Sequence, residues 1–430
     1  MSFSLFLLQV IFWVIIGFGL LTYTRQYIPS RFFLPLLGYK VIFGWLLGWL
    51  YLDYYEGGDT FVYYQNALVL SNLFAEDPIA YINVIIGNER LANLTLGEQP
   101  RALFFAKAAS LLSICSLGNY WIIALSLSMI SFFASWWFVA RLKALFGLHL
   151  YQVLIPFLVY PSFVFWSSGL LKESLALALI CTLGGLALGF YTKGFSSPRK
   201  ALFILLMMAI SAFMLWKLKY YYAAVLLPML LLMMIWKLVS SLVIIKRQAA
   251  LLPGLGIVFA VLILIVMQLH PNLNPDYLLE AIMLNHELTV AASLKGGYVS
   301  FPGLEADWLS FIAYYPRAVY NGLFAPFPFL QGFSFLHLLA GIENLVVLVL
   351  SSLAIISLFF QRNQNLRHYG VVVLCVLYIV ILAGLITMAS PNYGSLIRYR
   401  VAYAPFWLML VLLALDKNLI LNFWRSRKKT

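Results

Sequence analysis

The run "FSLFLLQVIFWVIIGFGLLT", residues 3–22, decides the fold class because it carries no charged side chain. A membrane-spanning helix needs roughly 20 consecutive apolar residues. Similar runs follow along the 430-residue chain, which is 63% hydrophobic and 10% charged, with a mean hydropathy of +0.94. So few polar side chains cannot coat a water-soluble globule of this size, which excludes a soluble enzyme. Strands that alternate over about ten residues, typical of an outer-membrane barrel, are not seen.

The pattern predicts an all-α, polytopic transmembrane helical bundle of about 11 spans, forming a single integral membrane domain over residues 1–430. The expected spans are 3–22, 32–52, 119–140, 149–166, 174–192, 201–216, 221–245, 251–268, 335–360, 369–388 and 401–416. The apolar stretch 102–117 contains Lys107 and ends at Gly118. We expect this stretch to be a juxtamembrane or re-entrant helix in an external loop.

Charge sorts between the two sides of this bundle if 102–117 does not cross the membrane. One side takes 13 of the 15 acidic residues, mainly in the external loops 53–118 and 269–334. The other side takes 16 of the 28 Lys and Arg residues, including those of a basic tail, 417–430. The positive-inside rule makes this second side the cytoplasm. We therefore expect a multi-pass protein of the bacterial inner (plasma) membrane, with its C-terminus in the cytoplasm.

The net charge of +13 fits cytoplasmic loops that contact anionic membrane lipids, and no basic stretch with exposed aromatic platforms indicates nucleic acid. The three cysteines all lie in apolar stretches and are expected to pack there.

The segment "YYEGGDTFVYYQNA", residues 54–67, places a carboxylate at the outer end of a span. Gly57 and Gly58 permit an unusual backbone turn, and Asp59 or Thr60 then suits the N-cap of a helix. Tyr63 follows Asp59 by four residues, on the same helical face. One interpretation makes Asp59 a plain cap. The other makes it a general base or a metal ligand just above the bilayer.

A second acid lies in "YPSFVFWSSGLLKESLALAL", residues 160–179. Pro161 and the Ser-Ser-Gly stretch are expected to break the helix at the outer surface, and Lys172 and Glu173 then begin the next apolar span. A cap remains one interpretation, since an acid in the first turn is favoured by the helix dipole. A functional role is the other, because an acid beside an apolar run is costly to bury.

Lysines interrupt the positive-inside pattern in "WKLKYYY", residues 216–222, where Lys217 and Lys219 are expected on the outer side. Cations in this position call for an anionic partner, and a phosphate is the natural one. The alternative is interfacial anchoring by lysine and tyrosine side chains.

Arginines show the same exception near the end of the chain. Arg398 and Arg400 lie in "SPNYGSLIRYRVAYAPF", residues 390–406, and Arg317 lies in "YYPRAVYNGLFAPFPF", residues 314–329. The arginine fork suits bidentate contacts with phosphate. Snorkelling at a helix start is the alternative for the pair near the C-terminus.

These motifs resemble the GT-C superfamily of membrane glycosyltransferases, which take sugars from polyprenyl-phosphate carriers outside the cytoplasm. "GGDTFVYYQNA" resembles the first external loop of that superfamily and puts Asp59 in its catalytic position. "PSFVFWSSGLLKES" resembles the outer turn that carries a second acid, here Glu173. "RYRVAYAPF" is similar to an element before the final span, with the proline displaced to Pro405. The chain departs from the family in having two spans before the loop and a lone acid there.

The resemblance implies a glycosyltransferase of envelope or exopolysaccharide assembly that acts on a glycan, lipid or protein acceptor. Asp59 is expected to be the base, and Glu173 a second carboxylate or the ligand of a divalent metal. The other expected site residues bind the substrate: Tyr63, Lys172, Lys217, Lys219, Arg317, Arg398 and Arg400. Two alternatives stay open: a polymerase or ligase of O-antigen or exopolysaccharide, and a transporter or flippase of lipid-linked sugars.

Overall fold

The computed structural model describes residues 3–87, 93–96, 99–194, 197–242, 252–293, 297–329, 335–360 and 369–415. Over these ranges the chain is helical, and its only β-type pairing is an isolated bridge between Tyr298 and Asn392. The all-α prediction is therefore confirmed. The chain forms two compact units, Met1–Ala223 and Ala224–Thr430. The predicted basic tail, 417–430, lies outside the described residues.

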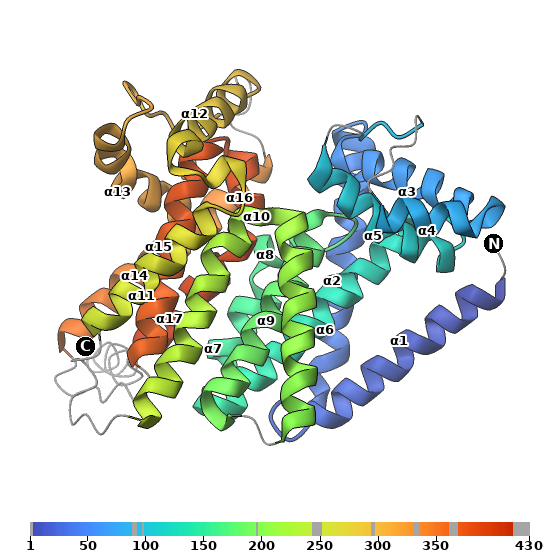
Figure 1. Ribbon diagram of the computed structural model, residues 1–430, viewed down its shortest axis with the longest axis horizontal. Helices are drawn as coiled ribbons and strands as arrows, with labels where there is room; N and C mark the ends of the chain where they lie inside the picture. The colour runs from blue at the N-terminus through green and yellow to red at the C-terminus, as the bar shows by residue number, and fades with distance from the viewer. Residues whose placement is uncertain are drawn as a thin grey trace, which may run out of the picture. The chain divides into compact units, whose positions relative to one another are not determined.

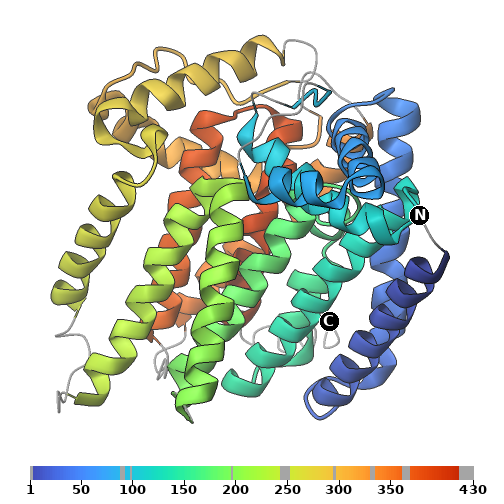
Figure 2. The same ribbon diagram turned by 45° about the vertical axis from the view of Figure 1, so that its right-hand side comes forward.

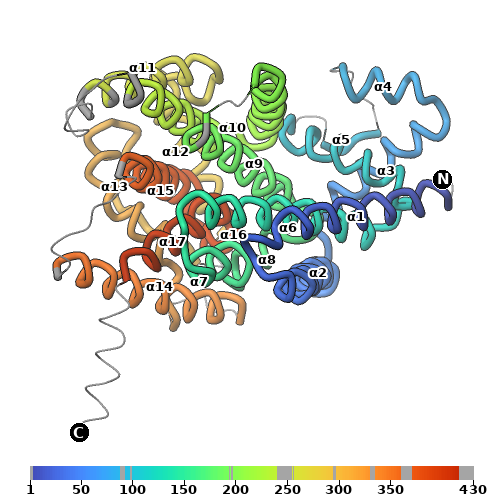
Figure 3. The backbone as a smooth tube through the Cα atoms, turned by 90° about the horizontal axis from the view of Figure 1, so that it is seen from below, coloured from blue at the N-terminus to red at the C-terminus, as the bar shows by residue number. Residues whose placement is uncertain are grey.

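The first unit contains the first nine α-helices and the beginning of the tenth (Figure 1). These are α1 (Phe3–Thr24), α2 (Phe33–Trp49), α3 (Asp59–Glu76), α4 (Pro78–Ile86), α5 (Pro100–Cys115), α6 (Tyr120–Phe146), α7 (Leu150–Leu154), α8 (Pro161–Trp166), α9 (Lys172–Lys193) and α10 (Pro198–Leu242). Helix α6 packs against α9, α2 and α1, as Figure 3 shows from below. The side chain of Gln9 on α1 donates a 2.7 Å hydrogen bond to Ser126 on α6.

Seven helices of the described ranges are long and apolar enough to cross a membrane, or eight if one bent pair counts as a span. Their outward surfaces are apolar. On α1, for example, Val14 is 65% and Phe18 is 71% exposed. A surface of this kind needs a lipid environment to cover it. These helices are consistent with an integral membrane protein of several spans.

The predicted total of about 11 spans is not confirmed. Three predicted spans are broken or short, and the predicted spans 201–216 and 221–245 fall largely in one candidate helix, Pro198–Val239. The predicted span 149–166 divides into α7, a π-helical turn and α8, with non-helical backbone at Tyr160 (φ −54°, ψ 111°). The following residue, Pro161, disfavours helical backbone at the position before it. Helix α11 (Leu252–Met267) has only 16 residues. Near the C-terminus, the pair Tyr393–Ala402 and Ala404–Ala414 is bent by 67°.

Helix α10 breaks at Lys219, whose backbone is non-helical (φ −150°, ψ 77°). Its 45 residues would form an unbroken rod of about 68 Å, more than twice the roughly 30 Å hydrocarbon core of a bilayer. The break falls where the sequence predicts the loop between spans 201–216 and 221–245. This detail of the prediction agrees with the structure.

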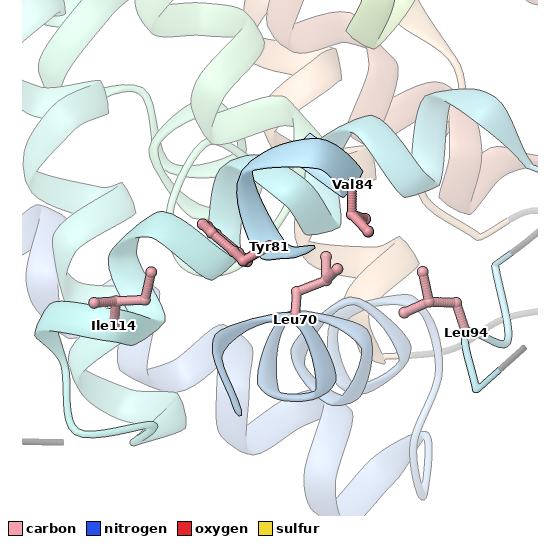
Figure 4. Packing of buried hydrophobic residues seen from close by; sticks show 5 residues of the cluster. All are labelled: Leu70, Tyr81, Val84, Leu94 and Ile114. Atoms are coloured by element: carbon pink, nitrogen blue, oxygen red, sulfur yellow. The ribbon is translucent and has the colours of Figure 1, made fainter. Parts of the chain in front are cut away.

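Helices α3, α4 and α5 lie together in the first unit (Figure 1). Their shared core contains Leu70, Tyr81, Val84, Leu94 and Ile114 (Figure 4). Helix α5 covers most of the stretch expected not to cross the membrane, and it is not among the candidate spans. That α5 is juxtamembrane, and the side of the membrane on which it lies, stay predictions.

The second unit begins in the later part of α10 and continues with helices α11 to α17. Besides α11 these are α12 (Pro275–Ala291), α13 (Trp308–Phe324), α14 (Phe335–Phe360), α15 (Tyr369–Ala389), α16 (Tyr393–Tyr399) and α17 (Ala404–Ala414). Helices α12 and α13 both pack against α15, and α14 packs against α17. Figure 2 shows α12, coloured gold, lying crosswise at one end of this unit. The predicted second external loop, 269–334, thus contains two helices.

Close packing of α2 makes Gly44 sensitive to substitution. A Cβ at Gly44 would overlap Oγ of Ser128 on α6 and lie 3.2 Å from the backbone nitrogen of Gly169. We expect Gly44→Ala to lower the free energy of unfolding by about 1–3 kcal/mol, because overpacking forces its neighbours apart. Gly38→Ala on the same helix meets nothing within 4 Å and is the matched control. Thermal unfolding in detergent measures both, and equal midpoints for the two variants would contradict this packing.

Candidate functional site

Asp59 is the first residue of α3, and its side chain is exposed. The turn before it uses left-handed backbone at Gly57 (φ 135°) and Gly58 (φ 90°), as the sequence predicts. The N-cap is Gly58, and no side chain caps this helix end. The predicted cap at Asp59 or Thr60 is therefore wrong. Thr60 is buried and its hydroxyl shares a 2.9 Å hydrogen bond with that of Tyr120.

Tyr63 connects the start of α3 with the start of α9. Its ring is buried and meets the ring of Phe105 on α5 edge to face, with 5.1 Å between the centroids. Nζ of Lys172 lies 5.0 Å from the centroid of the same Tyr63 ring. Contacts of a cation with an aromatic ring stabilise by about 0.5–2 kcal/mol. Two of the predicted substrate-binding residues are thus in direct contact.

The turn between α8 and α9 is held by hydrogen bonds that replace those of a continuous helix. Gly169 has left-handed backbone (φ 68°), and its N–H donates to Oγ of Ser128 at 2.8 Å. The hydroxyl of Ser174 donates to the carbonyl of Gly169, also at 2.8 Å. This turn positions Lys172 and Glu173 at the start of α9.

Glu173 forms a buried ion pair with Lys219, in which Nζ of Lys219 lies 2.6 Å from Oε1 of Glu173. The two side chains are 0% and 3% exposed. Nζ of Lys219 also lies 5.1 Å from the ring centroid of Tyr222. The anionic partner of Lys219 is thus a carboxylate of the protein itself, and the prediction did not foresee this partner.

Metal ligation by Glu173 receives no support from its surroundings. A lysine ammonium lies at the distance of a direct hydrogen bond, and it competes with a metal ion for the same carboxylate. Within the described ranges, no three His, Cys, Asp or Glu side chains come together as a metal site would require. The ion pair instead connects the start of α9 with the break in α10.

Three further cations lie on α5 and just before the break in α10; we call Arg101, Lys107 and Lys217 the α5 cation group. The guanidinium carbon of Arg101 lies 5.5 Å from the ring centroid of Tyr220. Nζ of Lys107 donates a 3.0 Å hydrogen bond to the carbonyl of Gly87. Burial lowers the pKa of Lys107, and the nearby charge of Lys217 lowers that pKa further.

Arg101 was missed by sequence reasoning, and Lys107 was noted only as a charge in an apolar stretch. The lysine does leave a local signal, because it interrupts an otherwise apolar run. Arg101 leaves none, since the tyrosines that it contacts follow far along the chain.

Arg400, in the second unit, is buried and holds the end of α13. Its Nε donates to the carbonyl of Gly322 at 2.9 Å, and Nη1 donates to Oδ1 of Asn344 at 2.6 Å. Nη2 donates to the carbonyl of Ala325. These contacts give Arg400 a structural role, because they satisfy carbonyls at a helix end.

The two other predicted arginines have aromatic contacts within the second unit. The guanidinium carbon of Arg317 lies 5.8 Å from the ring centroid of Phe301, and that of Arg398 lies 5.9 Å from the ring centroid of Tyr399. Arg317 is exposed and Arg398 is half-buried. Their predicted role in binding a phosphate stays a prediction.

In the first unit the structure thus connects Tyr63 on α3 with Lys172 on α9, and Glu173 on α9 with Lys219 on α10. Asp59 lies one helical turn before Tyr63 on α3. Lys217 belongs to the neighbouring α5 cation group. That the arginines of the second unit join the same site stays a prediction.

Comparison with known proteins finds no match for this chain among family models, curated proteins or solved structures.

The buried ion pair generates a prediction about stability. Lys219→Met and Glu173→Met should each lower the free energy of unfolding by about 3 kcal/mol, since each leaves a buried charge without its partner. The double variant should lose less than either single variant, because two apolar side chains then meet. Denaturant titration in detergent measures the double-mutant cycle.

Lys200→Met removes an exposed lysine and is the matched control. Additive losses in the double variant would show that the two charges do not interact.

Proposed function

We propose that this protein is a membrane glycosyltransferase that transfers a sugar from a polyprenyl-phosphate carrier to an acceptor hydroxyl on the extracytoplasmic face. The acceptor is a glycan, a lipid or a protein of the cell envelope. The observation that carries the proposal is the contact of Lys172 with Tyr63, one helical turn from Asp59. This contact puts an exposed carboxylate and a cation at neighbouring helix ends.

Asp59 is the proposed general base. It is exposed at the first turn of α3, where the helix dipole stabilises the negative charge of the carboxylate. The carboxylate takes the proton of the acceptor hydroxyl as that oxygen attacks the anomeric carbon of the sugar. The bond from this carbon to the carrier phosphate breaks at the same time, and the phosphate leaves with the bonding electrons.

We propose that Lys172, which contacts Tyr63 one helical turn from Asp59, and Lys217 stabilise the charge that develops on the leaving phosphate. Lys172 is half-buried at the start of α9 and Lys217 is exposed. Lys219 is neutralised by Glu173, so we assign this pair to positioning the start of α9 rather than to the phosphate. The carboxylate of Glu173 then acts on the reaction only through the residues beside it.

The transporter or flippase remains a second candidate because the structure contains a feature typical of that class. The helical segment from α7 to α9 is interrupted on both sides of α8. The turn that follows α8 contacts α2 at Lys40 and Gly44, near the middle of the candidate span Ser30–Tyr54. Lys40 is buried, and its Nζ lies 2.5 Å from Oγ of Ser167. Broken helices with polar groups at mid-membrane form the binding sites of many transporters.

Substitution of Asp59 tests the transferase. Asp59→Asn keeps the shape of the side chain but removes the base, so sugar transfer should fall by a factor of about 100 or more. Transfer is measured with radiolabelled polyprenyl-phosphate sugars in membranes that contain the protein. The matched control is Asp53→Asn, which changes another exposed acid of the same loop and should leave transfer unchanged.

Two results would contradict the assignment: full transfer by correctly inserted Asp59→Asn protein, or equal losses in both variants. Passage of a lipid-linked sugar across proteoliposomes without any product would favour the transporter instead.

A further inference from the structure

The α5 cation group collects three positive side chains without a described acid to balance them. None of Arg101, Lys107 and Lys217 forms an ion pair with a carboxylate of the described residues. The charges of Lys107 and Lys217 act on each other, and like charges held together are destabilising. An anion placed beside Lys107 and Lys217 would remove this repulsion.

An apolar stripe on α10 leads directly to this group. Leu206, Ile210 and Phe213 are 52%, 44% and 58% exposed, and Lys217 follows on the same helix with an exposed side chain. The spacing of four, three and four residues puts all four side chains on one helical face. The stripe covers about 16 Å along the helix axis, which is about half of the hydrocarbon core.

Aromatic side chains mark the level of the membrane interface beside the cations. The guanidinium carbon of Arg101 lies 5.5 Å from the ring centroid of Tyr220 and 6.0 Å from that of Tyr221. Nζ of Lys217 lies 5.8 Å from the ring centroid of Phe213, the last residue of the stripe. Tyrosine is enriched where lipid headgroups meet the hydrocarbon. The cations therefore lie where a headgroup lies when its chain follows the stripe.

From this juxtaposition we infer that Arg101, Lys107 and Lys217 bind the phosphate headgroup of a membrane lipid whose chain lies along Leu206, Ile210 and Phe213. A phosphate offers several acceptor oxygens to the guanidinium of Arg101 and the two ammonium groups. The stripe favours a lipid over free phosphate, because only a lipid covers the apolar surface below the cations. The inference goes beyond the proposed reaction, since it holds whether or not this lipid is the sugar donor.

Binding of a polyprenyl monophosphate to the purified full chain in detergent tests the inference. The variant R101Q/K107Q/K217Q should bind it at least about tenfold more weakly, because the loss of even one charged hydrogen bond to the phosphate weakens binding by about this factor. The matched control R25Q/R199Q/K200Q removes three exposed cations elsewhere in the first unit and should bind the lipid as the wild type does. Thermal stabilisation of the protein by increasing lipid gives the apparent Kd.

Two comparison ligands separate the possible sources of the phosphate. The uncharged polyprenol should bind more weakly than its phosphate, and inorganic phosphate alone should compete poorly with the lipid. Unchanged lipid binding in R101Q/K107Q/K217Q overturns the inference. Inorganic phosphate that binds as tightly as the lipid overturns the role of the stripe. If the triple variant does not fold, K217Q alone is measured, with K200Q as its control.

Lys217 belongs to both proposals, and the Asp59→Asn variant separates them. Protein carrying Asp59→Asn should keep its affinity for polyprenyl monophosphate, because Asp59 is not part of the α5 cation group. Loss of transfer with retained binding supports both proposals. Normal transfer by the Asp59→Asn protein removes the base but leaves the lipid site in place.

Discussion

The buried ion pair of Glu173 with Lys219 is the interaction on which the arrangement of the first unit depends. It joins two interruptions of regular helix: the turn before α9 and the non-helical residue inside α10. Backbone groups at a buried helix break lose their helical partners and need other partners within the protein. Ser128 and Ser174 supply them at Gly169. The ion pair then fixes the start of α9, and with it the contact of Lys172 with Tyr63.

The charged residues of the first unit include a buried pair with a structural role and a set of more exposed side chains. Glu173 and Lys219 neutralise each other in the interior, and their pairing contributes to the packing of helices. Outside this pair lie exposed acids, including Asp53, Glu56 and Asp59, and cations on α5, α9 and α10. In the second unit, Arg400 is a buried cation with a structural role. Its guanidinium donates hydrogen bonds to backbone carbonyls and to an amide oxygen of the protein.

Hydropathy predicts the long helices because a long apolar run in a membrane can satisfy its backbone hydrogen bonds only as a helix. The polar stretch around Lys219 correctly predicts the break in α10. The π-helical turn at Ile155–Val159 left no clear signal, so a broken helix was predicted as a continuous span. The ion pair of Glu173 with Lys219 could not be predicted from the sequence, because the two residues are 46 positions apart. The local sequence pattern indicated a functional role for both Glu173 and Lys219. It did not show that they neutralise each other, and it gave no reason to connect Arg101 with tyrosines on another helix.

The central claim is that the exposed carboxylate and the cations meet on the extracytoplasmic face. Labelling with a membrane-impermeant maleimide tests it directly, in protein whose three native cysteines have been replaced. Cysteine introduced at Asp59 or at Lys217 should be labelled in intact cells, whereas cysteine at Lys200 should be labelled only after permeabilisation. Labelling of Lys200 from outside, with Asp59 and Lys217 protected until the membrane is opened, would place the carboxylate and the cations in the cytoplasm and contradict the account.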